Sequence, residues 1–233
     1  MELTAEIMLN GLFSILVIFV FVAVGLKILF KYKEYNKSVF FLTGFAWIGL
    51  SEPWWPSAIG FLLVLLTGSG LSIEAYLILN NFFLPMFLYS WLMAVTKMMQ
   101  TKRRTLILIL YLLIAIILEG FMLYYLITDV SKLGITISPV DIEFGLITIV
   151  HIAFNLIVFM ISGILFSIKT LKLKDPENTL RGKFLLLAFI LFLIGAILEI
   201  VITLPPNRII ILFSAIIFYI GFMMPEGIKT RFL

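Results

Sequence analysis

The chain has 233 residues, of which 63% are hydrophobic and only 13% are charged, and its mean hydropathy is +1.19. A soluble domain of this length cannot bury so much apolar surface, so we expect one integral membrane domain over residues 1–233. The longest polar stretch, residues 169–183, is too short to fold alone, which excludes a built-in kinase, nuclease or nucleotide-binding domain. Cysteine is absent, which excludes disulfides and thiolate-bound metals. The abundance of Ile, Leu, Phe and Lys is typical of an AT-rich prokaryotic genome.

The apolar runs predict an all-α bundle of seven transmembrane helices, because each run reaches the roughly 20 residues that a bilayer crossing needs. The predicted spans are residues 7–30, 38–68, 72–98, 104–128, 140–168, 183–204 and 207–225.

The basic residues predict the orientation of these spans. Fifteen of the seventeen Lys and Arg follow the first, third, fifth and seventh spans, and only Lys132 and Arg208 fall on the other side. Cytoplasmic loops carry the excess of Lys and Arg. We therefore expect a multi-pass protein of the plasma (cell) membrane with its N-terminus outside, its C-terminus inside and the basic loops in the cytoplasm.

The second span is too long for a straight crossing and contains helix breakers. Residues 38–68 would form a helix of about 46 Å, against a hydrocarbon core of about 30 Å. Proline removes a backbone donor and clashes with the preceding turn, so we expect a kink or break near Glu52 and a further kink in the third span. The two tryptophans between the prolines are equally typical of a membrane-interface belt, and residues 57–67 could cross the bilayer or lie at its surface. The kink residues are Pro53, Trp54, Trp55, Pro56 and Pro85.

Several polar side chains fall at one depth in five different spans. Each lies 14 to 18 residues from the basic residue at the cytoplasmic end of its span, which is roughly 21 to 27 Å along a helix. Polar groups at membrane depth usually face the bundle interior or water, so this layer predicts a polar cavity in the outer half. The candidate ligand- or ion-binding residues are Glu52, Asn80, Asn81, Glu119, His151, Asn155 and Glu199.

Each candidate also has a structural interpretation. A single histidine on an apolar helix is often a hydrogen-bonded core residue, and Asn80 and Asn81 could join helices by hydrogen bonds. Glu199 could lie near the outer headgroups. Three carboxylates and one histidine could bind a cation, relay protons or pair with an amine. With a single histidine, these residues supply too few nitrogen ligands for a metal site. No catalytic residues are predicted.

The predicted topology is similar to that of microbial rhodopsins and of the seven-helix sensor regions of prokaryotic signalling proteins. The resemblance covers the whole chain but rests on topology, without a shared motif. A rhodopsin would carry retinal on a lysine within the seventh span, whereas this chain has no lysine there before Lys229. We therefore expect no retinal and no other cofactor.

These patterns favour a seven-helix sensor or receptor-like module that binds a small ligand, ion or proton and acts through a separate protein partner. One alternative is a transporter for protons, cations or a small solute. A second is an accessory or structural subunit of a membrane complex. An enzyme is not expected, the residual case being one that acts on lipids. The expected partners are the lipid bilayer, another protein and a small ligand or cation, with no nucleic acid.

Overall fold

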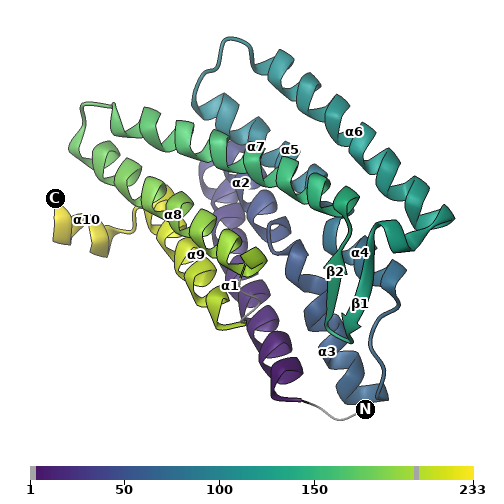
Figure 1. Cartoon of the computed structure of the whole chain (residues 1–233). Helices are drawn as coiled ribbons and strands as arrows, with labels where there is room; N and C mark the ends of the chain where they lie inside the picture. Colours follow the sequence, from purple (N-terminus) through teal and green to yellow (C-terminus); the bar gives the residue numbers. More distant parts are fainter. Residues whose placement is uncertain (1–3, 202–204) are drawn as a thin grey trace.

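The computed structural model describes residues 4–201 and 205–233, and the chain is all-helical, with 83% of it in helices (Figure 1). The described helices and short 3₁₀ turns (η) are α1 (Ala5–Tyr35), α2 (Ser38–Gly49), η1 (Glu52–Trp54), α3 (Trp55–Thr67), α4 (Ile73–Asn81), α5 (Leu84–Met98), α6 (Arg104–Thr128), η2 (Val130–Lys132), α7 (Leu146–Leu171), α8 (Pro176–Val201), η3 (Pro205–Asn207), α9 (Arg208–Met223) and α10 (Glu226–Phe232).

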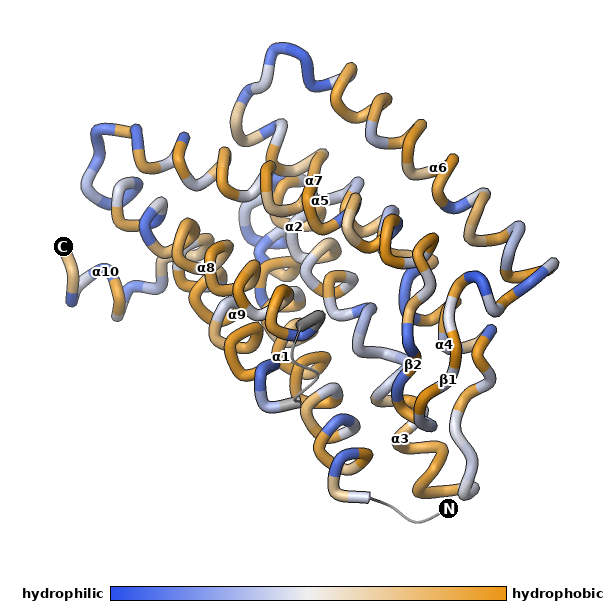
Figure 2. The backbone as a smooth tube through the Cα atoms, viewed as in Figure 1, coloured by the Kyte–Doolittle hydropathy of each residue, from blue (hydrophilic) through white to orange (hydrophobic). Residues whose placement is uncertain are grey.

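Within the described part of the chain, six helical segments are long and apolar enough to cross a membrane. They are Ala5–Tyr35, Ser38–Thr67, Ile73–Met98, Arg104–Thr128, Leu146–Leu171 and Pro176–Glu199. With 16 residues, or about 24 Å, α9 qualifies only together with α10, and the two helices meet at a bend of 81°. The prediction of a polytopic helical membrane protein is confirmed, with six spans, or seven if the bent pair is one span. Figure 2 shows hydrophobic stretches along the helices and hydrophilic stretches mainly at their ends.

The second and third predicted spans are both broken at their prolines. α2 ends at Gly49, and the chain passes through η1 before α3 begins at Trp55. α4 ends at Asn81, and α5 begins at Leu84 with Pro85 in its first turn. Proline suits the first turn of a helix, where its missing N–H has no intrahelical partner, so each proline starts a new helix after the break.

Two predicted boundaries are wrong. Residues 140–144 belong to an antiparallel hairpin of β1 (Gly134–Ser138) and β2 (Asp141–Phe144), and α7 begins only at Leu146. α8 begins at Pro176 rather than at residue 183, because Pro176 favours a helix start and Glu177 pairs with Arg181 one turn later. The predicted end of that span, residue 204, lies outside the described residues.

The hairpin is attached to α3 and α4 at one end of the bundle, which we call the hairpin end. The Tyr76 hydroxyl of α4 donates to the carbonyl of Val140 at 3.3 Å and lies 2.9 Å from the Ser57 hydroxyl of α3. Val140 packs with Ile7 of α1 and Phe61 of α3. The start of α1 and the hairpin therefore lie at the same end of the molecule.

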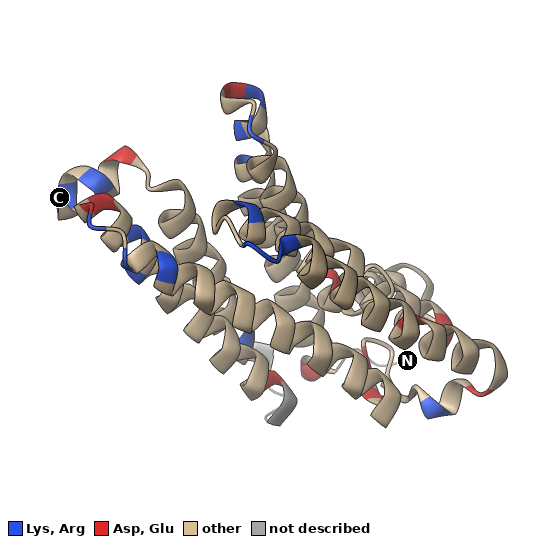
Figure 3. Cartoon of the chain, turned by 90° about the horizontal axis from the view of Figure 1, so that it is seen from above, with Lys and Arg blue, Asp and Glu red and all other residues tan. Residues whose placement is uncertain are grey.

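The opposite end carries most of the positive charge, and we call it the basic end (Figure 3). The Lys97 ammonium donates to the Ser38 hydroxyl at 2.7 Å, and the Lys169 ammonium donates to the Met99 carbonyl. These bonds bring together the ends of α2, α5 and α7. The basic end consists of residues 33–37, 97–104, 169–183 and 229–231.

Between η1 and the basic end, the bundle is filled by large aromatic side chains. The rings of Trp47 and Phe218 stack with centroids 3.9 Å apart, and Trp91 packs against Phe159 and Phe189. All five side chains are almost completely buried.

A close contact between α1 and α2 depends on two glycines. A Cβ atom on Gly44 would lie 2.5 Å from the carbonyl oxygen of Gly25, and a Cβ atom on Gly25 would lie 2.7 Å from that of Gly44. Small residues allow helix backbones to approach in membranes, where van der Waals packing drives association. This contact fixes α2, and with it the position at which η1 begins.

Candidate functional site: a carboxylate–histidine cluster at the helix breaks

The two helix breaks bind each other through side chains of the predicted polar layer. Glu52 is completely buried, and its Oε1 accepts a hydrogen bond from the backbone N–H of Phe83 at 2.7 Å. Asn80 donates through Nδ2 to the carbonyl of Pro53 at 2.7 Å. Broken helices are tolerated at membrane depth when protein groups satisfy the exposed backbone. Glu52 and Asn80 perform that role here.

A second pair of polar residues lies between α6 and α7. Nε2 of His151 is 3.5 Å from Oε1 of Glu119, a contact distance without hydrogen-bond geometry. Asn155, one turn along α7, donates to the His151 carbonyl at 3.0 Å and accepts from the Tyr111 hydroxyl at 2.8 Å. Tyr111 and Asn155 therefore support the helix segment that presents His151, and the Asn155 amide is engaged in bonds of its own.

The two sets of residues form one cluster. Glu119 lines a groove together with Phe82, and the next residue, Phe83, donates its backbone N–H to Glu52. We define the carboxylate–histidine cluster as Glu52, Asn80, Asn81, Glu119 and His151. Its residues come from η1, α4, α6 and α7.

The cluster is rich in polar atoms that have no hydrogen-bond partner among the described residues. They are Glu52 Oε2, Asn80 Oδ1, both amide atoms of Asn81, both carboxyl oxygens of Glu119 and both ring nitrogens of His151. A buried polar group without a partner costs about 1–3 kcal/mol, and native proteins contain only a few of them. So many unpartnered polar atoms in one cluster destabilise the fold, so selection for stability alone does not explain them.

The seventh candidate, Glu199, lies in a separate network. Its Oε1 accepts from Arg208 Nε at 2.7 Å and from Trp54 Nε1 at 3.1 Å. Arg208 also donates to the Asn10 side chain at 2.8 Å and to the Ser14 hydroxyl at 2.6 Å. The prediction that Glu199 joins the other carboxylates at one site is therefore wrong, because an arginine on α9 pairs with it instead.

The tryptophans of η1 and α3 take different positions. Trp54 is buried in the main core, so it is not a membrane-interface residue. Trp55 is partly buried, and its Nε1 donates to the Ser51 hydroxyl at 2.9 Å. The short turn η1 thus joins the cluster through Glu52 and the arginine network through Trp54.

Sequence reasoning missed four of the polar residues that the structure brings together: Asn10, Ser14, Tyr111 and Arg208. Asn10 and Ser14 are four residues apart in an apolar helix, which places them on one face. Arg208 is isolated from every other basic residue of the chain. Those two signals could have predicted a buried pair with Glu199, whereas the tyrosine gave no distinguishing pattern.

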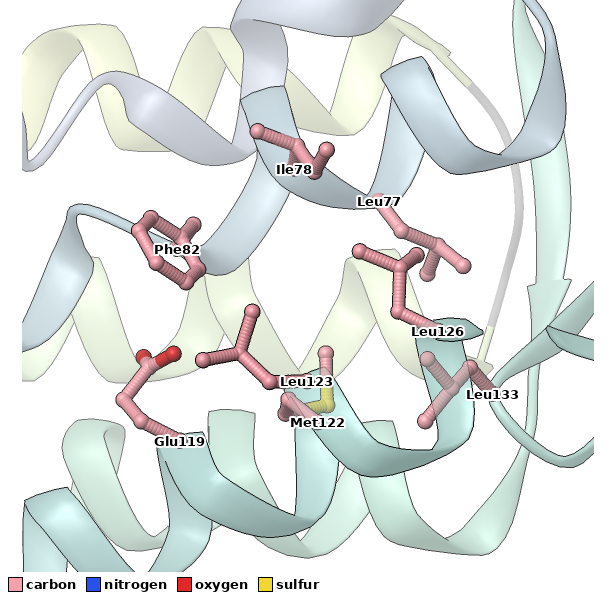
Figure 4. Close-up of a pocket in the computed structure, with 8 residues that line it drawn as sticks. All are labelled: Leu77, Ile78, Phe82, Glu119, Met122, Leu123, Leu126 and Leu133. Carbon is pink, nitrogen blue, oxygen red and sulfur yellow. The ribbon is translucent and has the colours of Figure 1, made fainter. Parts of the chain in front are cut away.

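A half-open groove leads to Glu119 between α4 and α6 (Figure 4). Seven apolar side chains line the groove together with Glu119. Its cavity volume for a water-sized sphere is only about 10 Å³. That is close to the minimum space for one water molecule. In Figure 4 the Glu119 carboxyl group points toward Phe82, at one end of the groove.

The fold and these polar groups define the class of the chain as a polytopic helical membrane protein. No protein-family model matches the chain, and no match is found among curated proteins or solved structures. Within residues 4–201 and 205–233, no group of three His, Asp or Glu residues could hold a metal ion. Any function is therefore argued from the cluster itself.

Proposed function

We propose that this protein is a sensor or receptor-like membrane module that binds a small cationic ligand, an ion or a proton at the carboxylate–histidine cluster. The observation that carries the proposal is the meeting of eight unpartnered polar atoms from four helical segments at the two helix breaks. Two carboxyl groups favour a positively charged ligand, and the His151 ring and the Asn81 amide supply donors and acceptors that orient it. Ionisable residues at membrane depth are costly and are typically functional.

The packing below the cluster favours a sensor over a transporter. A transported ion would have to pass the level of Trp47, Trp91 and Phe218 to reach the basic end. Among the described residues at that level, the Trp91 Nε1 donates to Ser162 at 2.9 Å, and the rings of Trp47 and Trp91 pack against Phe218. A ligand can change the arrangement of the helix breaks without crossing this barrier.

A transporter for protons, cations or a small solute is the second candidate. One observation favours it, namely that two broken spans face each other, with Glu52 bound to Phe83 and Asn80 bound to Pro53. Discontinuous helices of this kind form the binding sites of many transporters. An accessory subunit of a membrane complex is a further alternative, supported by the many apolar side chains on the outside of the bundle.

For the membrane arrangement, we propose seven crossings, with α9 as the seventh, the hairpin end outside and the basic end in the cytoplasm of the cell. The gathering of Lys and Arg at one end supports it through the positive-inside rule. Because the chain has no cysteine, single cysteines can report sidedness. A membrane-impermeant thiol reagent applied to intact cells should label Lys132→Cys and leave Lys172→Cys unlabelled. The reverse pattern, or labelling of both, would contradict this orientation.

The sensor would signal through its basic end, where short loops and α10 are available to a separate protein. Lys229 of α10 pairs with Glu177 at 2.8 Å, and Arg181 donates to the Phe222 carbonyl at 2.9 Å. The first contact connects α10 to the start of α8, and the second connects α8 to the end of α9. A rearrangement of those helices would therefore change the surface that a partner meets.

Binding is tested with the purified protein in lipid nanodiscs, using ethylammonium, Na⁺ and pH as probes. We expect at least one probe to raise the unfolding temperature in a saturable manner, because it binds only the native state. Glu52→Gln and Glu119→Gln should abolish the shift, whereas Glu74→Gln, at an exposed site on α4, should retain it. Equal shifts in all variants, or no shift with any probe, would refute the proposal. Cation flux in proteoliposomes that both cluster variants abolish would favour the transporter.

A further inference from the structure

We propose that the ligand is an amphiphile with a protonated amine head and an aliphatic tail, which reaches the cluster from within the bilayer through the groove between α4 and α6. This inference rests on the proposed function and specifies the chemical class of its ligand and its route of entry. It follows from the lining of the groove, the acidic side chains at its inner end and the packing of α6.

The groove has the chemical polarity of an amphiphile. Leu77 and Ile78 of α4 and Phe82, the residue after α4, face Met122 and Leu123 of α6. Glu119 is the single ionisable residue among the described lining residues. The rim residues Ile78, Phe82 and Leu123 are 38%, 37% and 40% exposed. These rim positions lie within predicted spans, so the groove opens toward lipid rather than toward bulk water.

The inner end of the groove is complementary to an amine. Both carboxyl oxygens of Glu119 are buried and unpartnered, and the equally unpartnered Nε2 of His151 lies 3.5 Å away. The Glu52 carboxyl group binds the N–H of Phe83, which follows the lining residue Phe82. An ammonium group has three donors and no acceptor, so it could bond Glu119 and two further acceptors of the cluster. A carboxylate or phosphate head would meet two acidic groups and no Lys or Arg of the cluster.

The element that would move to admit the tail is α6. Only 17% of its membrane-spanning stretch is buried, compared with 33–61% for the five other spans. It stands at the edge of the bundle in Figure 1, next to α5 and α7. The groove at present has space for about one water molecule, so tail binding requires α6 to separate from α4. Loosely packed elements have the lowest free energy of local opening.

An amine with an aliphatic tail should bind this groove more tightly than a purely hydrophilic cation. Seven of the eight lining residues are apolar, and each methylene that leaves water adds to the binding free energy. A tail that only moves from lipid into the groove gains less, so its effect is measured against a control of equal tail length. Among ligands with the same tail, affinity should therefore be higher for an amine head. Among amines, affinity should be higher for a longer tail.

The test uses a decylamine carrying a terminal diazirine, which is photolysed with the protein in phosphatidylcholine nanodiscs, followed by peptide mass spectrometry. We expect saturable labelling of residues 77–82 and 122–126, at least fivefold reduced by excess decylamine. Decanol, with the same tail and no charge, should not compete, and ethylamine should compete only at much higher concentration. Glu119→Gln should lose the labelling, whereas Glu74→Gln should keep it.

A second measurement examines the movement of α6 without changing a charged residue. In the variant Phe82→Cys with Leu123→Cys, a short bifunctional thiol reagent would hold α4 and α6 together. We expect bridging to abolish decylamine labelling while the unbridged variant and each single cysteine keep it. Labelling that persists after complete bridging would overturn the route of entry.

The remaining outcomes separate this inference from the proposed function. Labelling spread over all lipid-exposed helices, without competition by decylamine, would overturn the amphiphile site. If ethylamine then still stabilises the wild type and not Glu119→Gln, the proposed function stands with a hydrophilic ligand. If neither amine nor Na⁺ nor pH gives a shift that depends on Glu119, both proposals fail.

Discussion

Replacing Arg208 by methionine should destabilise the protein strongly and so show that Glu199 is a structural residue. Arg208 is buried and donates to Glu199, to the backbone and side-chain oxygens of Asn10, and to Ser14, at 2.6–2.9 Å. Removing one partner of a buried ion pair typically costs 3–5 kcal/mol, since it leaves an uncompensated charge. Glu199 retains the Trp54 hydrogen bond and is 27% exposed, so we expect the lower part of that range, about 3 kcal/mol.

The assay is equilibrium unfolding by sodium dodecyl sulfate in mixed micelles, followed by tryptophan fluorescence. The double variant Arg208→Met with Glu199→Met should recover more than half of the loss, because no unpaired charge remains in it. Lys229→Met is the matched control. Its pair with Glu177 is exposed, so the midpoint should not change measurably.

Two results would refute this reasoning. A loss below about 1 kcal/mol for Arg208→Met would mean that the network is solvated and contributes little. Additive losses in the double variant would mean that Glu199 and Arg208 act independently. In the first case Glu199 would again be a candidate for ligand binding.

Three further substitutions test the packing and the hairpin. Gly44→Val should destabilise the protein by about 3 kcal/mol in the same assay, because its side chain would collide with the Gly25 backbone, whereas Gly120→Val, with open space around it, should have little effect. Tyr76→Phe should speed amide hydrogen exchange in residues 134–144 by about fivefold, since it removes hydrogen bonds worth about 1 kcal/mol. Burial raises the pKa of the Asp141 carboxyl group, so its ionisation makes the fold less stable as pH rises from about 4 through that raised value. Asp141→Asn should therefore raise the unfolding temperature at pH 7 and leave it nearly unchanged at pH 4.

A binding role of Glu52 can be distinguished from a structural role by measuring both ligand response and stability in Glu52→Gln. Glu52 accepts a hydrogen bond from the Phe83 backbone, so Glu52→Gln can retain that bond through its amide oxygen. Loss of ligand response with nearly unchanged stability would agree with a binding role. A large loss of stability would instead identify Glu52 as a residue that mainly closes the helix break.

Local chemistry made several features predictable from the sequence. Long apolar runs fix the helices, because an unpaired backbone is not tolerated in lipid. Pro53, Pro56 and Pro85 act on their own and neighbouring turns, so both breaks could be placed to within a few residues. The common depth of Glu52, Asn80, Glu119 and His151 follows from the constant rise of a helix.

Tertiary structure decided which of these residues meet. Rise per residue gives the depth of a side chain but not the direction in which its helix faces, and that direction depends on packing against other helices. Glu199 has the expected position along its helix, yet it bonds to Trp54 of η1 and pairs with Arg208 of α9, whereas Glu119 faces His151. The hairpin at residues 134–144 was missed for a related reason. The sequence predicts a connection between two spans at residues 129–139 and assigns residues 140–144 to the fifth span, because only the pairing of the two segments makes them β-structure. The sequence by itself therefore determined the class of protein, the helix breaks and the positions of the polar residues along their helices, while the rotation and packing of the helices determined which of them meet.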